Sequence, residues 1–115
     1  THEELIDRAA RLFKVLGNSL RIHILFYLRK HGESPVSAIA GHLGVSQPVI
    51  SKQLGILKKY DFVQKRKAGL FVYYSINDQD IVQIIDAMTE HWTTGPAAIV
   101  LLLFLIQTKT ASTFR

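Results

Sequence analysis

Residues 35 to 59 contain two short helical patterns separated by one tight turn, and this arrangement restricts the fold more than any other part of the chain. The first pattern, PVSAIAGHL, is followed by Gly44 and Val45, which form the turn. Ser46 is then a suitable N-cap for the second helix. Two helices joined by a short turn that contains glycine match a helix-turn-helix.

The second helix of this pair has a buried side and an exposed side. Ile50, Leu54 and Leu57 recur at helical spacing and predict one buried stripe. Pro48 is the second helical residue, where its missing N–H has no intrahelical partner to lose. In a helix-turn-helix the second helix enters the major groove of DNA with its N-terminal residues. The exposed front that we predict to meet base edges or phosphates consists of Gln47, Pro48, Val49, Ser51 and Lys52.

Two amphipathic helices precede this pair. The first is predicted over residues 3 to 16, with leucines at helical spacing. Ser19 suits the N-cap of the second helix, which His31 and Gly32 close. Pro35 is expected in the first turn of the third helix.

The period of the pattern changes after the helix-turn-helix. Residues 62 to 66 and 70 to 76 are rich in β-branched and aromatic side chains and predict a β-hairpin, with Gly69 in a left-handed turn position. A fifth helix follows, with Asp78 or Asp80 near its N-terminus. The predicted fold is mainly α with a small β-hairpin, a winged helix-turn-helix in the order α-α-α-α-β-β-α.

Positive charge is concentrated around the hairpin and the helix before it. The chain has a formal net charge of +5 and a sequence pI of about 9.7. Residues 44 to 67 hold six Lys and Arg residues against Asp61 alone, so this third of the chain carries the whole net charge (six minus one). A localised basic patch is the usual electrostatic footprint of nucleic-acid binding, and a solvated charged face is the alternative. We predict that Lys65, Arg66 and Lys67, at the tip of the hairpin, contact phosphates or the minor groove.

Three segments carry a resemblance to a known family. They are FKVLGNSLRIHILFYL, VSAIAGHLGVSQPVISKQLGILKKYDFV and KRKAGLFVYYSIND. Over about residues 12 to 92 the chain resembles the ArsR/SmtB family of bacterial repressors. The resemblance implies double-stranded DNA as a partner, an inverted-repeat operator, and a homodimer that packs through its first and last helices. The apolar stripes of both helices fit such an interface, although they could also serve the core of one protomer: Leu5, Leu12, Ile81, Ile85, Met88 and Trp92.

Metal sensing in this family uses positions that this chain fills differently. There is no cysteine, which excludes a thiolate site. The positions that match a second family site read Asp78, Asp80, His91 and Thr94. Two carboxylates and one imidazole make a poor transition-metal site, and both acids suit a helix start. We therefore expect no metal and no cofactor, and an unidentified effector ligand stays open.

Other function classes find less support. The chain shows no nucleophile–base motif, Gly-rich phosphate loop or HExxH, so we expect no enzyme. A winged-helix dimerisation module without DNA binding is the alternative. Residues 1 to 95 form the predicted DNA-binding and dimerisation domain, and residues 96 to 115 an apolar extension of unknown role. Its ten-residue apolar run is shorter than a membrane span, so we expect a cytoplasmic protein without a membrane partner.

Overall fold

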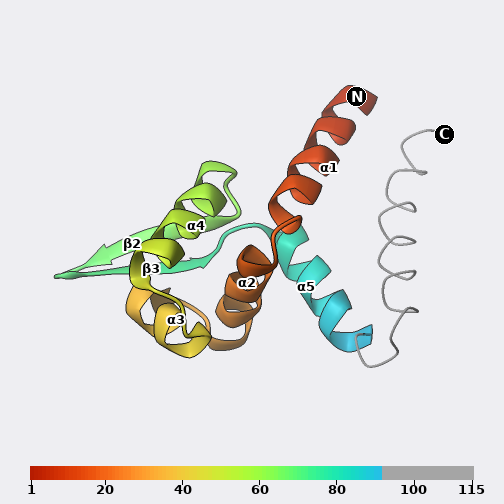
Figure 1. The fold of residues 1–115 in the computed structure, drawn as a ribbon. Helices are drawn as coiled ribbons and strands as arrows, with labels where there is room; N and C mark the ends of the chain where they lie inside the picture. The colour runs from red at the N-terminus through yellow and green to blue at the C-terminus, as the bar shows by residue number, and fades with distance from the viewer. Residues whose placement is uncertain (92–115) are drawn as a thin grey trace.

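The computed structural model describes residues 1–91 of the chain. This part contains five α-helices and a three-stranded antiparallel sheet (Figure 1). The predicted order is confirmed, with one short strand added, and the fold is a winged helix-turn-helix. The elements are α1 (His2–Leu16), α2 (Ser19–His31), β1 (Ser34–Pro35), α3 (Val36–Leu43), α4 (Gln47–Lys59), β2 (Val63–Ala68), β3 (Phe71–Ile76) and α5 (Gln79–His91).

The added strand, β1, corrects the predicted start of the third helix. Ser34 and Pro35 pair with Tyr74 and Tyr73 of β3, which gives the sheet the order β1-β3-β2. Pro35 is therefore the extended N-cap residue of α3 and not part of its first turn. A proline has no N–H to donate, so an edge strand accommodates it.

The turn between β2 and β3 is shorter than the sequence indicated. Gly69 has a φ of 62°, the predicted left-handed conformation. Ala68 pairs with Phe71, so the turn consists of Gly69 and Leu70 alone, and Lys67 lies in the strand. Two-residue turns with positive φ match the right-handed twist of the flanking strands, which explains why pairing continues to this point.

Side chains at the helix starts satisfy backbone N–H groups that have no intrahelical partner. Asn18, and not Ser19, caps α2, because its Oδ1 accepts a hydrogen bond from the N–H of Arg21 at 3.1 Å. Asp78 caps α5 by accepting from the N–H groups of Asp80 and Ile81. Ser46 occupies the predicted N-cap position of α4, but its side chain makes no capping hydrogen bond.

A single apolar core joins α2, α3, α4, α5 and the sheet, and Val15 near the end of α1 belongs to it. The predicted stripe of α4 is confirmed, because Ile50, Leu54 and Leu57 are fully buried. Arg29 of α2 forms a two-pronged ion pair with Asp86 of α5, at 2.8 and 2.9 Å. Helices α1 and α5 lie on the side of the core opposite to the hairpin (Figure 1), and α1 projects beyond the core.

No helix within residues 1–91 is long and apolar enough to cross a membrane. The predicted extension over residues 96–115 and Trp92 lie outside the described residues.

Candidate nucleic-acid interface

The N-terminal half of α4 presents a continuous exposed front. All five residues predicted for this front are exposed, while the buried stripe begins at Ile50 between them. Pro48 lies at the second helical position, as predicted, where it removes no intrahelical hydrogen bond. A Cβ atom added to Gly55 would meet no atom within 4 Å, so the outer face of α4 stays open along its length. The exposed front consists of Gln47, Pro48, Val49, Ser51 and Lys52.

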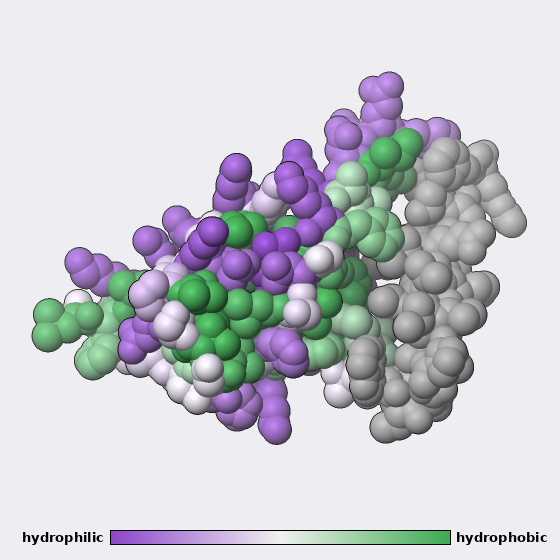
Figure 2. Space-filling view, viewed as in Figure 1, coloured by the Kyte–Doolittle hydropathy of each residue, from purple (hydrophilic) through white to green (hydrophobic). Residues whose placement is uncertain are grey.

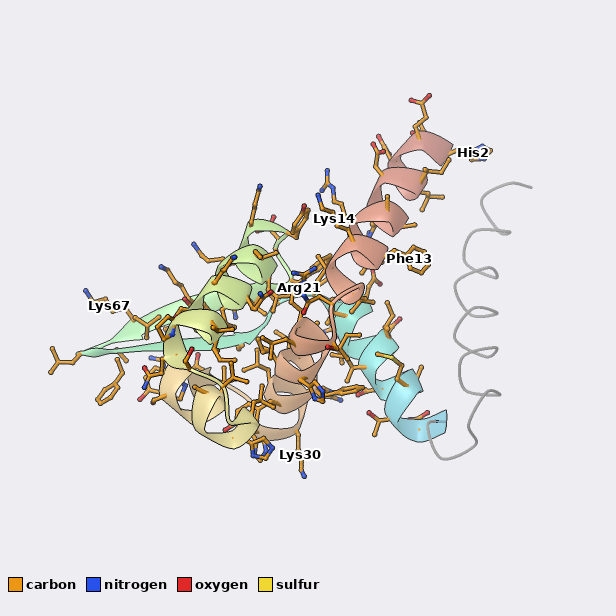
Figure 3. The ribbon with its side chains drawn as sticks, viewed as in Figure 1. His2, Phe13, Lys14, Arg21, Lys30 and Lys67 are labelled. Carbon is orange, nitrogen blue, oxygen red and sulfur yellow. The ribbon has the colours of Figure 1, made fainter. Side chains whose placement is uncertain are left out.

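The three basic residues of β2 point to two different faces of the hairpin. Side chains alternate along a strand, so Lys65 and Lys67 share one face and Arg66 lies on the other. Both lysines are exposed and, within residues 1–91, take part in no ion pair. Figure 3 shows Lys67 pointing away from the strands near the far end of the hairpin. The two lysines are therefore available to an anionic partner.

Arg66 is engaged within the protein. Its Nη2 donates to Glu33 Oε1 at 2.6 Å, and its Nε lies 3.1 Å from both carboxylate oxygens. Its guanidinium also lies 5.3 Å from the ring centroid of Tyr73, its cross-strand neighbour. The hydrogen bonds from Arg66 hold the pKa of Glu33 below its ordinary value. Arg66 thus serves first to join the hairpin to the residue before β1.

The tip of the hairpin is apolar, which corrects the prediction of a basic tip. Leu70 is 98% exposed and Phe71 is 58% exposed. Figure 2 shows this apolar surface at the end of the hairpin, with hydrophilic side chains along the flanking body. The basic residues lie two or more positions before the turn, because the strand pairs as far as Ala68.

The residues predicted for a dimer interface divide into two groups. Ile81 and Ile85 are buried in the core of the protomer, the alternative that the sequence left open. Leu5, Leu12 and Met88 are only partly buried, so part of each side chain stays accessible.

Sequence reasoning missed two large apolar residues on α1. Ile6 is 58% exposed and Phe13 is 53% exposed, although both belong to an amphipathic helix. They lie seven residues apart, beside Leu5 and Leu12, which are also seven apart. The signal was present in the sequence, because the two pairs together make the apolar face of α1 wider than a core contact needs.

The degenerate metal positions have structural roles where the structure describes them. Asp78 caps α5, and Asp80 forms an ion pair with Arg8 of α1. The side chain of His91 and Thr94 lie outside the described residues. Across residues 1–91 no group of three or more His, Cys, Asp or Glu side chains could hold a metal ion.

The fold gathers one aromatic cluster that the sequence did not indicate. The ring centroids of His31 and His42 lie 5.6 Å apart, and the ring of Tyr27 is tilted against both, with centroid distances of 4.3 Å to His31 and 5.0 Å to His42. His31 ends α2 and His42 lies in the last turn of α3, so their proximity depends on tertiary packing. Helical spacing alone places Tyr27 beside His31 on α2, but it could not have revealed the approach of His42.

Comparison with known proteins agrees with this geometry. Residues 18–65 match the model of the family described as bacterial regulatory protein, arsR family. The matched segment runs from the N-cap of α2 through the helix-turn-helix and into β2. It therefore contains the whole exposed front of α4.

Individual relatives match about three quarters of the chain. An uncharacterised HTH-type transcriptional regulator of Methanocaldococcus jannaschii is 38% identical over 87 residues, which cover 76% of this chain and 98% of the relative. The transcriptional repressor SdpR of Bacillus subtilis is 38% identical over 84 residues, covering 73% and 92%. The homodimeric winged helix-turn-helix DNA-binding domain of a Mycobacterium bovis protein superposes with a TM-score of 0.68 at 33% identity, covering 76% and 80%.

Proposed function

Because the chain belongs to the arsR family of bacterial regulatory proteins and is a DNA-binding transcriptional regulator, not an enzyme, we propose that it is a dimeric repressor. In this proposal each protomer places the N-terminal half of α4 in the major groove of one half of an inverted repeat. The exposed front of α4 carries this proposal, because it offers side chains of the types that read base edges next to a pair of free lysines.

The front of α4 combines polar and apolar contacts. Gln47 suits an adenine edge, and Lys52 suits guanine acceptors or a phosphate. Pro48 and Val49 present apolar surface to a thymine methyl group, and Ser51 can donate or accept a hydrogen bond. An operator that includes A·T pairs opposite Pro48 and Val49 is therefore expected.

The wing supplies affinity more than sequence preference. Lys65 and Lys67 lie on one face of β2 and neutralise phosphates wherever the hairpin lies along the duplex. Arg66 contributes less, because Glu33 already compensates its charge. The apolar tip at Leu70 can lie against the sugar edges of the minor groove, between the phosphate contacts.

Dimerisation through α1 and α5 is supported by the apolar surface that the protomer leaves exposed. Ile6 and Phe13 lie on α1, which projects beyond the core. An exposed apolar patch of this kind marks an interaction surface in a protein of this size. The Mycobacterium bovis neighbour is described as homodimeric. Since the proposed partner is genomic DNA, we place the protein in the cytoplasm.

Selection from a random duplex library tests the function directly. We expect enrichment of an inverted repeat whose half-sites are about 10–10.5 base pairs apart, or a multiple of this spacing. Affinity for the selected duplex should fall steeply with salt. Failure to enrich any duplex would favour the alternative, a winged-helix dimerisation module that does not bind DNA. No observation on residues 1–91 favours that alternative over DNA binding.

A further inference from the structure

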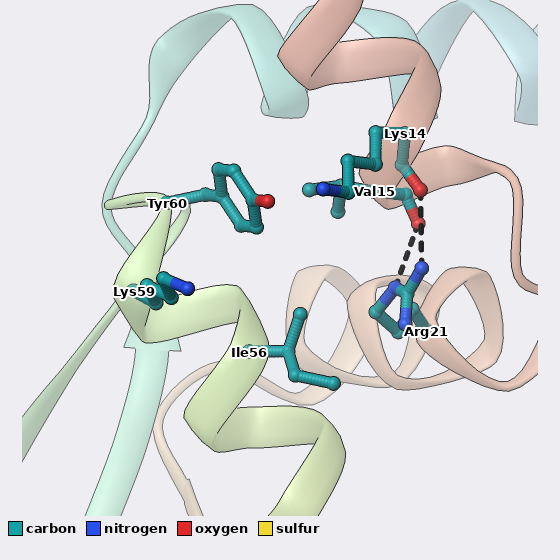
Figure 4. Close-up of a pocket in the computed structure, with 6 residues that line it drawn as sticks. All are labelled: Lys14, Val15, Arg21, Ile56, Lys59 and Tyr60. Atoms are coloured by element: carbon teal, nitrogen blue, oxygen red, sulfur yellow. Dashed lines mark hydrogen bonds between the residues drawn. The ribbon is translucent and has the colours of Figure 1, made fainter.

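A pocket of about 240 Å³ lies where the end of α1, the start of α2 and the end of α4 meet (Figure 4). It is separate from the exposed front of α4 and from the hairpin. Its lining has an apolar part and a basic part, and no acidic side chain belongs to it. The lining residues are Lys14, Val15, Arg21, Ile56, Lys59 and Tyr60.

The wall that Tyr60 forms is held by the backbone. The N–H of Asp61 donates to the carbonyl of Lys58 at 2.9 Å, and the N–H of Phe62 donates to the carbonyl of Leu57 at 3.0 Å. These two bonds form a Schellman motif that ends α4, with Asp61 in the left-handed conformation at φ 62°. The ring of Tyr60 also stacks on that of the buried Phe62, with centroids 6.3 Å apart. The aromatic wall is thus formed before any ligand arrives.

The opposite wall is fixed by Arg21. Its Nε donates to the carbonyl of Val15 at 2.9 Å and its Nη2 to the carbonyl of Lys14 at 3.0 Å (Figure 4). Its Nη1 donates to Gln53 Oε1 of α4 at 3.1 Å. Arg21 therefore uses its donors to hold the last turn of α1 against α2 and α4, and it adds positive charge behind the pocket.

Two exposed lysines, Lys14 and Lys59, belong to the lining of the pocket. The Nζ of Lys14 lies 5.8 Å from the centroid of the Tyr60 ring (Figure 4). A hydrogen bond from Lys14, with the nearby charges of Lys59 and Arg11, lowers the pKa of the Tyr60 hydroxyl. Lys14, Arg21 and Lys59 are thus the charged groups of the lining, and all three are cations, which favours an anion.

We propose that this pocket binds a small aromatic carboxylate, with the ring between Ile56 and Tyr60, above the buried Val15, and the carboxylate between Lys14 and Lys59. A volume of about 240 Å³ exceeds the cavity of roughly 150 Å³ that takes up benzene, so a single ring with a carboxylate fits. The apolar side chains remove the ring from water, and the ammonium groups provide charge-assisted hydrogen bonds.

Such a ligand would connect α1 with α4. Val15 and Lys14 belong to α1, whereas Ile56 and Lys59 belong to α4. The bound carboxylate also cancels one positive charge per protomer beside α4. Under the proposed function, the ligand therefore weakens DNA binding. This coupling rests on that function, whereas binding of the carboxylate does not.

Calorimetric titration of the full chain without DNA tests the site, with benzoate as the probe. Benzamide has the same ring without the charge, and acetate has the charge without the ring. We expect benzoate to bind at least about tenfold more tightly than either, since both the ring and the charged hydrogen bonds contribute. Equal binding of benzoate and acetate, or no binding of benzoate, overturns the proposal and leaves the DNA-binding function untouched.

Two matched variants then locate the site. Lys14→Gln and Lys30→Gln each remove the charge of one exposed lysine, and Figure 3 places Lys30 at the far end of α2 from Lys14. Lys14→Gln should weaken benzoate about tenfold, the loss expected for one hydrogen bond to a charged group. Lys30→Gln should change the affinity less than twofold. Equal losses in the two variants would mean diffuse charge attraction and would overturn the site.

Discussion

Arg66 and Glu33 join the hairpin to the segment before β1 through three donor–acceptor contacts of 2.6 to 3.1 Å. The two residues lie 33 positions apart in the sequence. The pair holds the middle of β2 against the segment between α2 and β1, and it leaves Lys65 and Lys67 as the two cations of β2 without an ion pair within residues 1–91.

The first prediction concerns these two lysines. Lys65→Ala/Lys67→Ala should weaken binding to the selected operator and to unrelated duplexes alike, because phosphate contacts carry no sequence information. Four charges are removed per dimer, so the slope of log K against log salt should become less steep by up to about 3.6, at roughly 0.9 per phosphate contact. Fluorescence anisotropy across a salt series measures both quantities.

Arg66→Ala provides the comparison for the wing. Because Glu33 compensates the charge of Arg66, this variant should change the salt slope less than either single lysine variant. If the salt slope changed more in Arg66→Ala than in Lys65→Ala, Arg66 would be the cation that contacts phosphate. That result would contradict the assignment of Arg66 to the ion pair with Glu33.

The second prediction concerns base reading by α4. Gln47→Ala should cost about 1–3 kcal/mol on the selected operator and little on a random duplex, because a bidentate base contact discriminates by that amount. Gln79→Ala is the matched control, since Gln79 is an exposed first residue of a different helix. Equal losses on operator and random duplex would assign Gln47 to a phosphate instead.

The third prediction concerns dimerisation. Phe13→Ser should raise the dimer dissociation constant at least about tenfold, because burial of a phenylalanine side chain contributes roughly 1.5–3 kcal/mol. Leu70→Ser is the control, since Leu70 is more exposed than Phe13 but lies at the tip of the hairpin. Analytical ultracentrifugation measures both, and an unchanged dimer in Phe13→Ser would remove α1 from the interface.

The fourth prediction separates a helix cap from a metal ligand at Asp78. Asp78→Ala should lower the free energy of unfolding by about 1 kcal/mol. Asp78→Asn should keep nearly the stability of the parent chain, because asparagine caps a helix as well as aspartate does. Chemical denaturation in the presence of a chelator checks this. A large loss in Asp78→Asn would mean that the carboxylate charge, and not the cap, is what the site requires.

The fifth prediction concerns pH. Hydrogen bonds from Arg29 lower the pKa of Asp86 below its ordinary value, so its contribution to stability is fully present above the unfolded value near 3.9 and is lost as pH falls through the folded pKa. Asp86→Asn should therefore be less stable than the parent chain at pH 6. The difference in the free energy of unfolding between the two proteins should stay constant down to about pH 4 and shrink below that pH.

Thermal or denaturant unfolding at a series of pH values follows this difference. Asp61→Asn is a suitable control, because Asp61 is exposed and has no ion pair within the described chain. A difference for Asp86→Asn that grows as pH falls below 4 would contradict the sign of the pKa change.

Local patterns predicted the elements, and tertiary contacts decided their details. The stripe Ile50, Leu54 and Leu57 follows directly from helical periodicity, so the buried and exposed sides of α4 could be derived. β1 could not, because two residues are too few to show alternation. The partner of Arg66 and the exposure of Phe13 depend on chain segments that only the folded structure brings together or leaves apart.

The same distinction applies to α5. Its stripe predicted an apolar face correctly, but periodicity does not tell which neighbour covers that face. Ile81 and Ile85 face the core of their own protomer, whereas Met88, one turn further along, remains partly accessible. Burial in a partner and burial in a core have the same sequence signature, so only the structure could separate them.

Arg21 connects the last carbonyls of α1 to Gln53 in the middle of α4. In the proposed dimer, this link holds α1 and α4 together as one rigid unit. The angle at which the two copies of α1 cross therefore sets the distance between the two copies of α4. Base recognition and half-site spacing are then encoded by different residues. Substitutions on α1 could change the length of the operator during evolution while the sequence of each half-site stays the same.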